Sequence, residues 1–190
     1  IFDDGLQDHS INYDLTFVCF NNLNWIGNGF TIPSGPLREN FKTIKDHKNI
    51  FITGNSTNLE RIKKEIIKIN PQSKILTALY VPLNLHEFDK KEKYLVFSGI
   101  GNHESFVSML KSNGLNVIKD LEFPDHYNYS YQKVYDITFQ AKKLNCKILT
   151  TEKDFLRLKG NNSNEIKFIK SELKINNEND FLNIVSNLHE

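Results

Sequence analysis

Two adjacent carboxylates stand close to the beginning of the sequence. Asp3 and Asp4 precede Gly5 at what reads as the carboxyl end of a strand. Ligands of parallel sheets bind beyond the carboxyl ends of the strands, and carboxylate oxygens suit Mg²⁺. The pair therefore indicates a site for a magnesium-bound nucleotide. The alternative interpretation is a plain turn with two solvated carboxylates.

A proline-flanked loop carries a guanidinium group and a further carboxylate. In residues 33–39 (PSGPLRE), two prolines stiffen a turn directly before Arg38 and Glu39. Arginine offers a planar fork that matches phosphate oxygens in pairs. The loop is therefore a candidate phosphate-binding element, or else a turn that ends in a surface ion pair.

A histidine lies beside a carboxylate in the aromatic stretch of residues 123–131 (FPDHYNYSY). Imidazole is the usual proton acceptor near neutral pH, and Asp125 could orient the ring of His126. The alternative is a loop histidine without a role in chemistry. We expect the aromatic side chains around it to pack the domain rather than to contact lipid.

Two further motifs follow predicted strands. Residues 99–102 (GIGN) lack the third glycine of a dinucleotide fingerprint, so we interpret them as a tight strand-to-helix turn. Residues 150–154 (TTEKD) have two readings. They either begin a helix with Thr151 as N-cap and Asp154 at N3, or they form the wall of a site where Lys153 meets an anion.

These segments need strands and helices to position them, and the hydrophobic pattern indicates both. Continuous apolar runs are typical of buried strands, and apolar residues at helical spacing are typical of helices. Their alternation predicts an α/β fold with parallel strands. Expected strands cover residues 15–20, 49–53, 94–98, 116–120 and 147–150, and expected helices cover residues 58–69, 103–113, 130–144 and 180–188.

The same pattern predicts two domains. The charged segment of residues 87–93 (EFDKKEK) is the expected linker between them. Residues 166–175 alternate apolar and polar side chains, and we expect them to pair with residues 75–85 as a two-stranded ribbon that joins the domains. The predicted parts are a first domain of residues 1–86, a second, smaller α/β domain of residues 94–165, and a return strand with a terminal helix in residues 166–190.

Composition and hydropathy limit the classes of function. The 24 basic and 23 acidic residues nearly cancel, which excludes a global field that would recruit nucleic acid or an anionic membrane. No apolar run reaches the roughly 18 to 20 residues that a membrane span needs. Cys19 and Cys146 lie in apolar runs without a partner motif, so we expect them to be reduced and buried, as is typical of the cytosol.

The order of the motifs (IFDDGLQ, GNG, PSGPLRE, FSGIGN, FPDHYNY and LTTEKD) resembles that of the tetraacyldisaccharide 4'-kinase family, the lipid A 4'-kinases of Gram-negative bacteria. The resemblance covers nearly the whole chain. It implies ATP-dependent transfer of the γ-phosphate to the 4'-hydroxyl of tetraacyldisaccharide 1-phosphate, which gives lipid IVA. It also implies a peripheral enzyme on the cytoplasmic face of the inner membrane.

The resemblance further implies a fold and a role for each matching residue. The fold would be a P-loop NTPase-like parallel sheet that lacks its N-terminal strands, together with a smaller α/β domain. Asp3 and Asp4 would hold Mg²⁺, with Asp4 helping to organise the attack on ATP. His126 would take the proton from the attacking hydroxyl, together with an aspartate from an upstream segment. The residues expected to bind substrate near the cleft are Gln7, Arg38 and Glu39.

The sequence departs from a complete kinase in one respect. No GxxxxGK[ST] motif occurs in its 190 residues, and the chain opens on Ile1 rather than on methionine. We therefore expect a fragment that is inactive alone. Three alternatives stay open: a non-catalytic nucleotide- or sugar-binding α/β domain, a glycosyltransferase whose acidic pair holds a divalent ion, and a degenerate homologue that retains only the fold.

Overall fold

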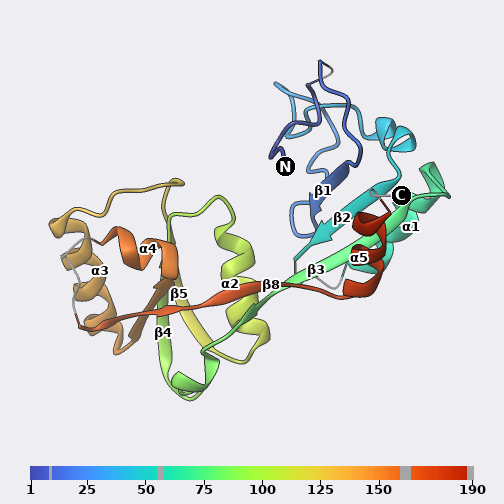
Figure 1. Ribbon diagram of the computed structural model, residues 1–190. Helices are drawn as coiled ribbons and strands as arrows, with labels where there is room; N and C mark the ends of the chain where they lie inside the picture. Colours follow the sequence, from blue (N-terminus) through green and yellow to red (C-terminus); the bar gives the residue numbers. More distant parts are fainter. Residues whose placement is uncertain (9, 55–57, 159–163, 188–190) are drawn as a thin grey trace. The chain divides into compact units, whose positions relative to one another are not determined.

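A computed structural model describes residues 1–8, 10–54, 58–158 and 164–187, and the chain divides into two compact units (Figure 1). Unit 1 consists of Ile1–Leu79 and Leu173–Glu190, and unit 2 consists of Tyr80–Glu172. The chain therefore passes between the units twice. These bounds differ from the predicted domains of residues 1–86, 94–165 and 166–190.

The first sheet has the strand order β1-β2-β3-β8, in which β1 pairs with β2 and β2 with β3 in parallel. An α-helix and a 3-10 helix pack with its apolar residues on one side, and a second α-helix packs with those on the other. The elements are β1 (Phe17–Asn21), η1 (Phe41–Asp46), β2 (Asn49–Thr53), α1 (Leu59–Ile69), β3 (Lys74–Pro82), β8 (Ser171–Ile175) and α5 (Glu178–Ser186).

The core of unit 1 forms around β2, whose continuous apolar run is buried on both faces. Ile50 and Ile52 belong to one cluster with the buried face of α1, whose apolar residues recur at helical spacing. Phe51 points the other way, because successive side chains of a strand alternate, and it packs with α5. Helix α1 ends at Ile69, and the side-chain amide of its C-cap residue Asn70 donates to the Ile44 carbonyl at 3.1 Å.

The second sheet is wholly parallel, with the strand order β5-β4-β6-β7. Helix α2 packs with one face of this sheet, and α3 packs with the other. None of the helices in the described part of the chain is long and apolar enough to cross a membrane. The elements are η2 (Leu85–Glu87), β4 (Lys93–Ser98), α2 (His103–Ser112), β5 (Asn116–Glu122), α3 (Tyr131–Leu144), β6 (Lys147–Thr151), α4 (Glu152–Arg157) and β7 (Ile166–Ile169).

The predicted linker of residues 87–93 is wrong, because this segment belongs to the core of unit 2. The ring of Phe88 is buried and meets the ring of Tyr94 edge to face, with 6.4 Å between the centroids. The Tyr94 hydroxyl donates to the Asp89 carbonyl at 2.8 Å. The sequence pattern missed Phe88 as a core residue because its neighbours in the chain are charged.

The predicted ribbon is only partly present. Residues 166–169 form β7, which pairs in parallel with β6 in the second sheet. Only residues 171–175, as β8, lie beside β3 in the first sheet. One alternating stretch therefore serves two sheets, and a break at Lys170 separates its two strands.

The start of the chain also differs from the prediction. Ile1 and Phe2 are exposed and form no strand, because no strand among the described residues pairs with them. Strand β1 is only half-buried, since the described residues pair it with β2 alone. Cys19 on β1 is exposed and Cys146 is half-buried, so the prediction that both are buried is wrong, although both are free.

The core of unit 2 gives a stability test. Leu149 on β6 is fully buried, so we expect Leu149→Ala to lower the free energy of unfolding by about 2–5 kcal/mol. Leu156 on α4 is 73% exposed, and Leu156→Ala should change it by less than about 0.5 kcal/mol. Urea unfolding followed by circular dichroism measures both, and equal losses would contradict the assigned core.

Candidate functional site

All five residues of unit 1 that the sequence singled out line one cavity of about 1000 Å³. Its walls come from the segment before β1, from β1 itself, from the loop that leads into η1, and from α5. The acidic pair and the proline-flanked loop are thus brought together, although the sequence separates them by some thirty positions. The five residues are Asp3, Asp4, Gln7, Arg38 and Glu39.

An ion pair joins the acidic turn to the proline-flanked loop. Arg38 Nη1 donates to Asp4 Oδ1 at 2.7 Å, and both side chains are more than half exposed. The backbone of Asp4 has a φ of 60°, a left-handed conformation that aspartate tolerates better than most residues. An exposed pair contributes at most about 1 kcal/mol, so this contact positions the guanidinium more than it stabilises the fold.

A second contact joins the same two segments. Gln7 Nε2 donates to Glu39 Oε1 at 3.1 Å. The Tyr13 hydroxyl donates to the Gly5 carbonyl at 2.8 Å, and a Cβ on Gly5 would lie 2.8 Å from that hydroxyl. A side chain at position 5 would therefore displace the Tyr13 hydroxyl from this bond. Sequence reasoning missed Tyr13, because an isolated tyrosine carries no signal in its spacing.

The acidic pair suits magnesium only in a site completed by other ligands. Among the described residues, no group of three or more His, Cys, Asp or Glu side chains is placed to hold a metal ion. Mg²⁺ is commonly held by one or two carboxylates, with waters and nucleotide phosphates as its other ligands. The carboxylates of Asp3 and Asp4 fit that pattern.

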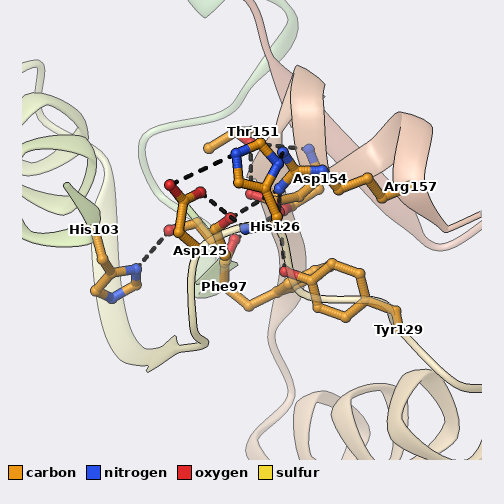
Figure 2. A network of polar contacts seen from close by, with 11 residues as sticks. Phe97, His103, Asp125, His126, Tyr129, Thr151, Asp154 and Arg157 are labelled. Atoms are coloured by element: carbon orange, nitrogen blue, oxygen red, sulfur yellow. Dashed lines mark hydrogen bonds and ion pairs between the residues drawn. The ribbon is translucent and has the colours of Figure 1, made fainter. Parts of the chain in front are cut away.

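In unit 2, His126 lies on the loop that follows β5 (Figure 2). Its φ of 58° is left-handed, and its N–H donates to the Gly99 carbonyl at 3.1 Å and to Asp125 Oδ1 at 2.8 Å. Asp125 Oδ2 lies 3.8 Å from His126 Nε2, beyond hydrogen-bond distance. The neighbouring carboxylate therefore holds the backbone of His126 more firmly than its ring.

A residue that the sequence analysis did not single out contacts the His126 ring. Arg157 Nη2 lies 3.0 Å from His126 Nδ1, and Arg157 Nη1 donates to the Gly99 carbonyl at 2.8 Å. Arg157 Nη1 also lies 3.3 Å from Asp154 Oδ1. An Asp–Arg pair three positions apart on a helix is a usable signal, but nothing in the sequence connects it to His126.

The Asp154 carboxylate is the centre of this network and is fully buried. Thr151 Oγ1 donates to Asp154 Oδ2 at 2.6 Å and accepts from the Asp154 N–H at 3.1 Å, and Tyr129 donates to Oδ1 at 3.1 Å. The helix reading of TTEKD is therefore confirmed, with Thr151 as the N-cap of α4. A contact of Lys153 with an anion stays a prediction.

The aromatic stretch packs as expected, with one exception. Tyr129 meets the Phe97 ring at 5.3 Å and the Tyr127 ring at 5.1 Å, and Phe123 stacks on Tyr127 at 4.8 Å. Tyr131 is 74% exposed at the start of α3, so the packing prediction is wrong for this residue. The packed rings hold the loop that carries His126.

The strand-to-helix turn after β4 is confirmed, and it explains how close the His126 loop can come. A Cβ on Gly99 would lie 3.0 Å from the Pro124 carbonyl oxygen. Asn102 caps α2 by accepting from the Ser105 N–H at 3.2 Å. Glycine at position 99 therefore leaves room for the loop directly above the strand.

A second polar chain, Ser98–His103–Asp120, has the residue types of a hydrolase triad. Ser98 Oγ lies 2.7 Å from His103 Nδ1, and His103 Nε2 lies 3.2 Å from Asp120 Oδ2. Because a carboxylate accepts, Nε2 carries the proton and Nδ1 accepts from the serine. Ser98 is fully buried and cannot reach a substrate. This chain fastens α2 to β4 and β5.

Comparison with known proteins gives one consistent family. A family model described as LpxK, tetraacyldisaccharide-1-P 4'-kinase, matches residues 1–190. A tetraacyldisaccharide 4'-kinase from Pelagibacter ubique (strain HTCC1062) is 56% identical over 100% of this chain and 60% of that protein. One from Rickettsia canadensis (strain McKiel) is 38% identical over 94% of this chain and 53% of that protein. The chain thus spans little more than half the length of these relatives.

The fold has a counterpart among solved structures. A crystal structure described as the "apo" form of LpxK from Aquifex aeolicus in complex with ATP matches with a TM-score of 0.58. The sequences are 22% identical, and the match covers 97% of this chain and 56% of that chain. Together with the two sheets, this likeness confirms the predicted α/β class.

The Tyr129–Asp154 contact predicts a pH dependence of stability. Burial of the ring, and next the carboxylate of Asp154, raise the pKa of Tyr129. A tyrosine of the unfolded chain loses its proton at about pH 10. Above that pH the folded protein keeps a proton that the unfolded chain has released, so the contribution of Tyr129 is complete below about pH 10 and declines as the pH rises further.

Urea unfolding of the wild type and of Tyr129→Phe from about pH 8 to about pH 11 measures this decline. We expect the free energy of unfolding of the wild type to fall more steeply, by at most about 1.4 kcal/mol per pH unit. Tyr131→Phe is the exposed control. Parallel curves for the wild type and Tyr129→Phe would contradict the assigned contact.

Proposed function

Because this chain belongs to the tetraacyldisaccharide-1-P 4'-kinase family, we propose that it serves ATP-dependent transfer of the γ-phosphate to the 4'-hydroxyl of tetraacyldisaccharide 1-phosphate. The product would be lipid IVA, a precursor in lipid A biosynthesis. The observation that carries the proposal is the family match over residues 1–190. The gathering of Asp3, Asp4 and Arg38 along one cavity of unit 1 supports it.

In this proposal Asp3 and Asp4 hold Mg²⁺, which would neutralise the charge on the phosphates of ATP. Arg38 would bind phosphate oxygens with the part of its fork that Asp4 does not occupy. Gln7 and Glu39, which already bond to each other, would bind substrate at the same cavity. Asp4 would also help to organise the attack on ATP.

The proposed role of His126 is that of general base. As the 4'-oxygen forms its bond to the γ-phosphorus and ADP leaves, the proton of the hydroxyl would pass to the imidazole. Its exposed side chain, 77% of which is accessible, could be reached by a large acceptor. The left-handed backbone of His126 supports the assignment, because strained residues concentrate at functional sites.

The acceptor also suggests where the protein works. A disaccharide with four acyl chains resides in a bilayer, so we propose peripheral contact with the cytoplasmic face of the inner membrane of a Gram-negative bacterium. The near-zero net charge gives no reason to expect nucleic acid as a partner. ATP and the lipid acceptor are the proposed ligands.

An assay of 4'-phosphorylation in detergent micelles, made with the complete gene product that contains this chain, tests the proposal. We expect His126→Ala to lower kcat by about 10²-fold or more, and Asp4→Ala to abolish magnesium-dependent transfer. His86→Ala and Asp46→Ala are matched controls, because both side chains are exposed and neither lines the cavity. Normal rates in the two site variants would remove these residues from the chemistry.

The same assay separates the competing interpretations. Because the 190 residues contain no GxxxxGK[ST] motif, we expect them to transfer no phosphate when tested alone. Preference of the complete gene product for a UDP-sugar over ATP would favour a glycosyltransferase. A folded product that binds ATP and Mg²⁺ but transfers nothing would indicate a binding domain or a degenerate homologue.

A further inference from the structure

The side chain that contacts the His126 ring is itself held by a buried acid. Arg157 is only 19% exposed, and Asp154 is inaccessible to solvent. A carboxylate removed from water must be compensated by hydrogen bonds and a counter-charge, or its burial destabilises the fold. Thr151, Tyr129 and Arg157 together provide this compensation. The arginine is therefore held near His126 by a carboxylate that cannot move without breaking several contacts.

The two ends of the guanidinium have different partners. Nη1 points inward, to Asp154 and to the Gly99 carbonyl at the end of β4. Nη2 points outward, to the His126 ring (Figure 2). The Gly99 carbonyl also accepts from the His126 N–H, so Arg157 and His126 share one acceptor. The Gly99 carbonyl thus holds the backbone of His126 directly, and it holds the ring of His126 through Arg157.

We propose that Asp154 and Arg157 form a positioning pair that fixes the orientation and the tautomer of the His126 imidazole. The role of this pair in phosphoryl transfer rests on the proposed role of His126. The contacts of Asp154 and Arg157 do not depend on that role. A role limited to stabilising α4 would need only the contact between the two members of the pair. It leaves the outward contact of Nη2 with a loop histidine 31 positions away unexplained.

The contact determines which ring nitrogen carries the proton. A guanidinium has five N–H donors and no acceptor, so Nδ1 of His126 must accept at this contact. The neutral ring then carries its proton on Nε2, the nitrogen that faces the Asp125 carboxylate at 3.8 Å. His126 at rest therefore offers a donor, and Nδ1 becomes able to take a proton only when the guanidinium moves away.

This arrangement adds a step to the proposed chemistry. If His126 accepts the proton of the attacking hydroxyl at Nδ1, Arg157 must first release that nitrogen. The proton that His126 gains is the one the hydroxyl loses, so no further reactant is needed. Asp154 would keep Arg157 close enough to return after the transfer, because its buried carboxylate stays where it is.

Nitrogen NMR of the histidine rings in the ¹⁵N-labelled chain tests the pair without any enzymatic turnover. At about pH 8, where an ordinary imidazole is neutral, we expect His126 of the wild type to show one protonated nitrogen, Nε2. His126→Gln identifies its signals. In Arg157→Met we expect the Nδ1 and Nε2 shifts to move toward those of His86, whose side chain is exposed.

Two conservative variants and an internal control sharpen the test. Arg157→Lys keeps a charged donor and should retain more of the wild-type shifts than Arg157→Met. Asp154→Asn keeps the volume but removes the counter-charge, and it should give intermediate shifts. His103 is held at both nitrogens by Ser98 and Asp120, so its signals should stay unchanged in every variant that folds.

The outcomes are separable from those of the kinase assay. A wild-type His126 that carries its proton on Nδ1, or shifts that do not respond to Arg157→Met and Asp154→Asn, would overturn the positioning pair. If Arg157→Met does not fold, Asp154→Asn, which removes the counter-charge of Arg157, and Tyr129→Phe, which removes one bond to Asp154, take its place in the comparison. Absence of phosphate transfer in the wild type would remove the proposed function and leave the tautomer result standing.

Discussion

A carboxylate that is wholly removed from water needs hydrogen bonds from the protein in place of those from water, and Asp154 is such a group. Its donors come from three parts of unit 2: the N-cap of α4, the aromatic loop and the last turn of α4. The hydrogen bonds that Asp154 needs therefore determine where α4 begins, where the buried Tyr129 hydroxyl lies and which way the Arg157 guanidinium points. The position of the His126 ring follows from the last of these.

The topology of the second sheet explains why these groups meet. After β4 the chain crosses to β5 on one side and then returns to β6 on the other, so the loops beyond β4 and β6 diverge at their carboxyl ends. Open α/β sheets bind ligands at such a switch point. Gly99 follows β4 and Thr151 ends β6, and the loop with His126 lies against both the turn and α4. The unit thus carries a polar network at the place where its fold leaves room for one.

The sequence alone was sufficient where local and tertiary preferences agree. The apolar run of β2 and the helical spacing of α1 each specify their element within a few neighbouring residues, whereas residues 150–154 allowed two interpretations until the structure showed Thr151 as the N-cap of α4. It was insufficient where a contact spans the fold. Arg38 reaches Asp4 across 34 positions and Arg157 reaches His126 across 31, and no local pattern records either distance. A single buried ring, Phe88, was likewise hidden by the charged residues around it.

The double passage of the chain between the units has a consequence for synthesis on the ribosome. Unit 2 is one continuous stretch, whereas unit 1 is completed only by Leu173–Glu190. Unit 2 is therefore synthesised in full before the last segment of unit 1. Strand β3 has no β8 to pair with until unit 2 has been made. Domains generally fold as units during translation. The nascent chain would then carry an open strand edge on β3 (Lys74–Pro82) until β8 (Ser171–Ile175) has been synthesised.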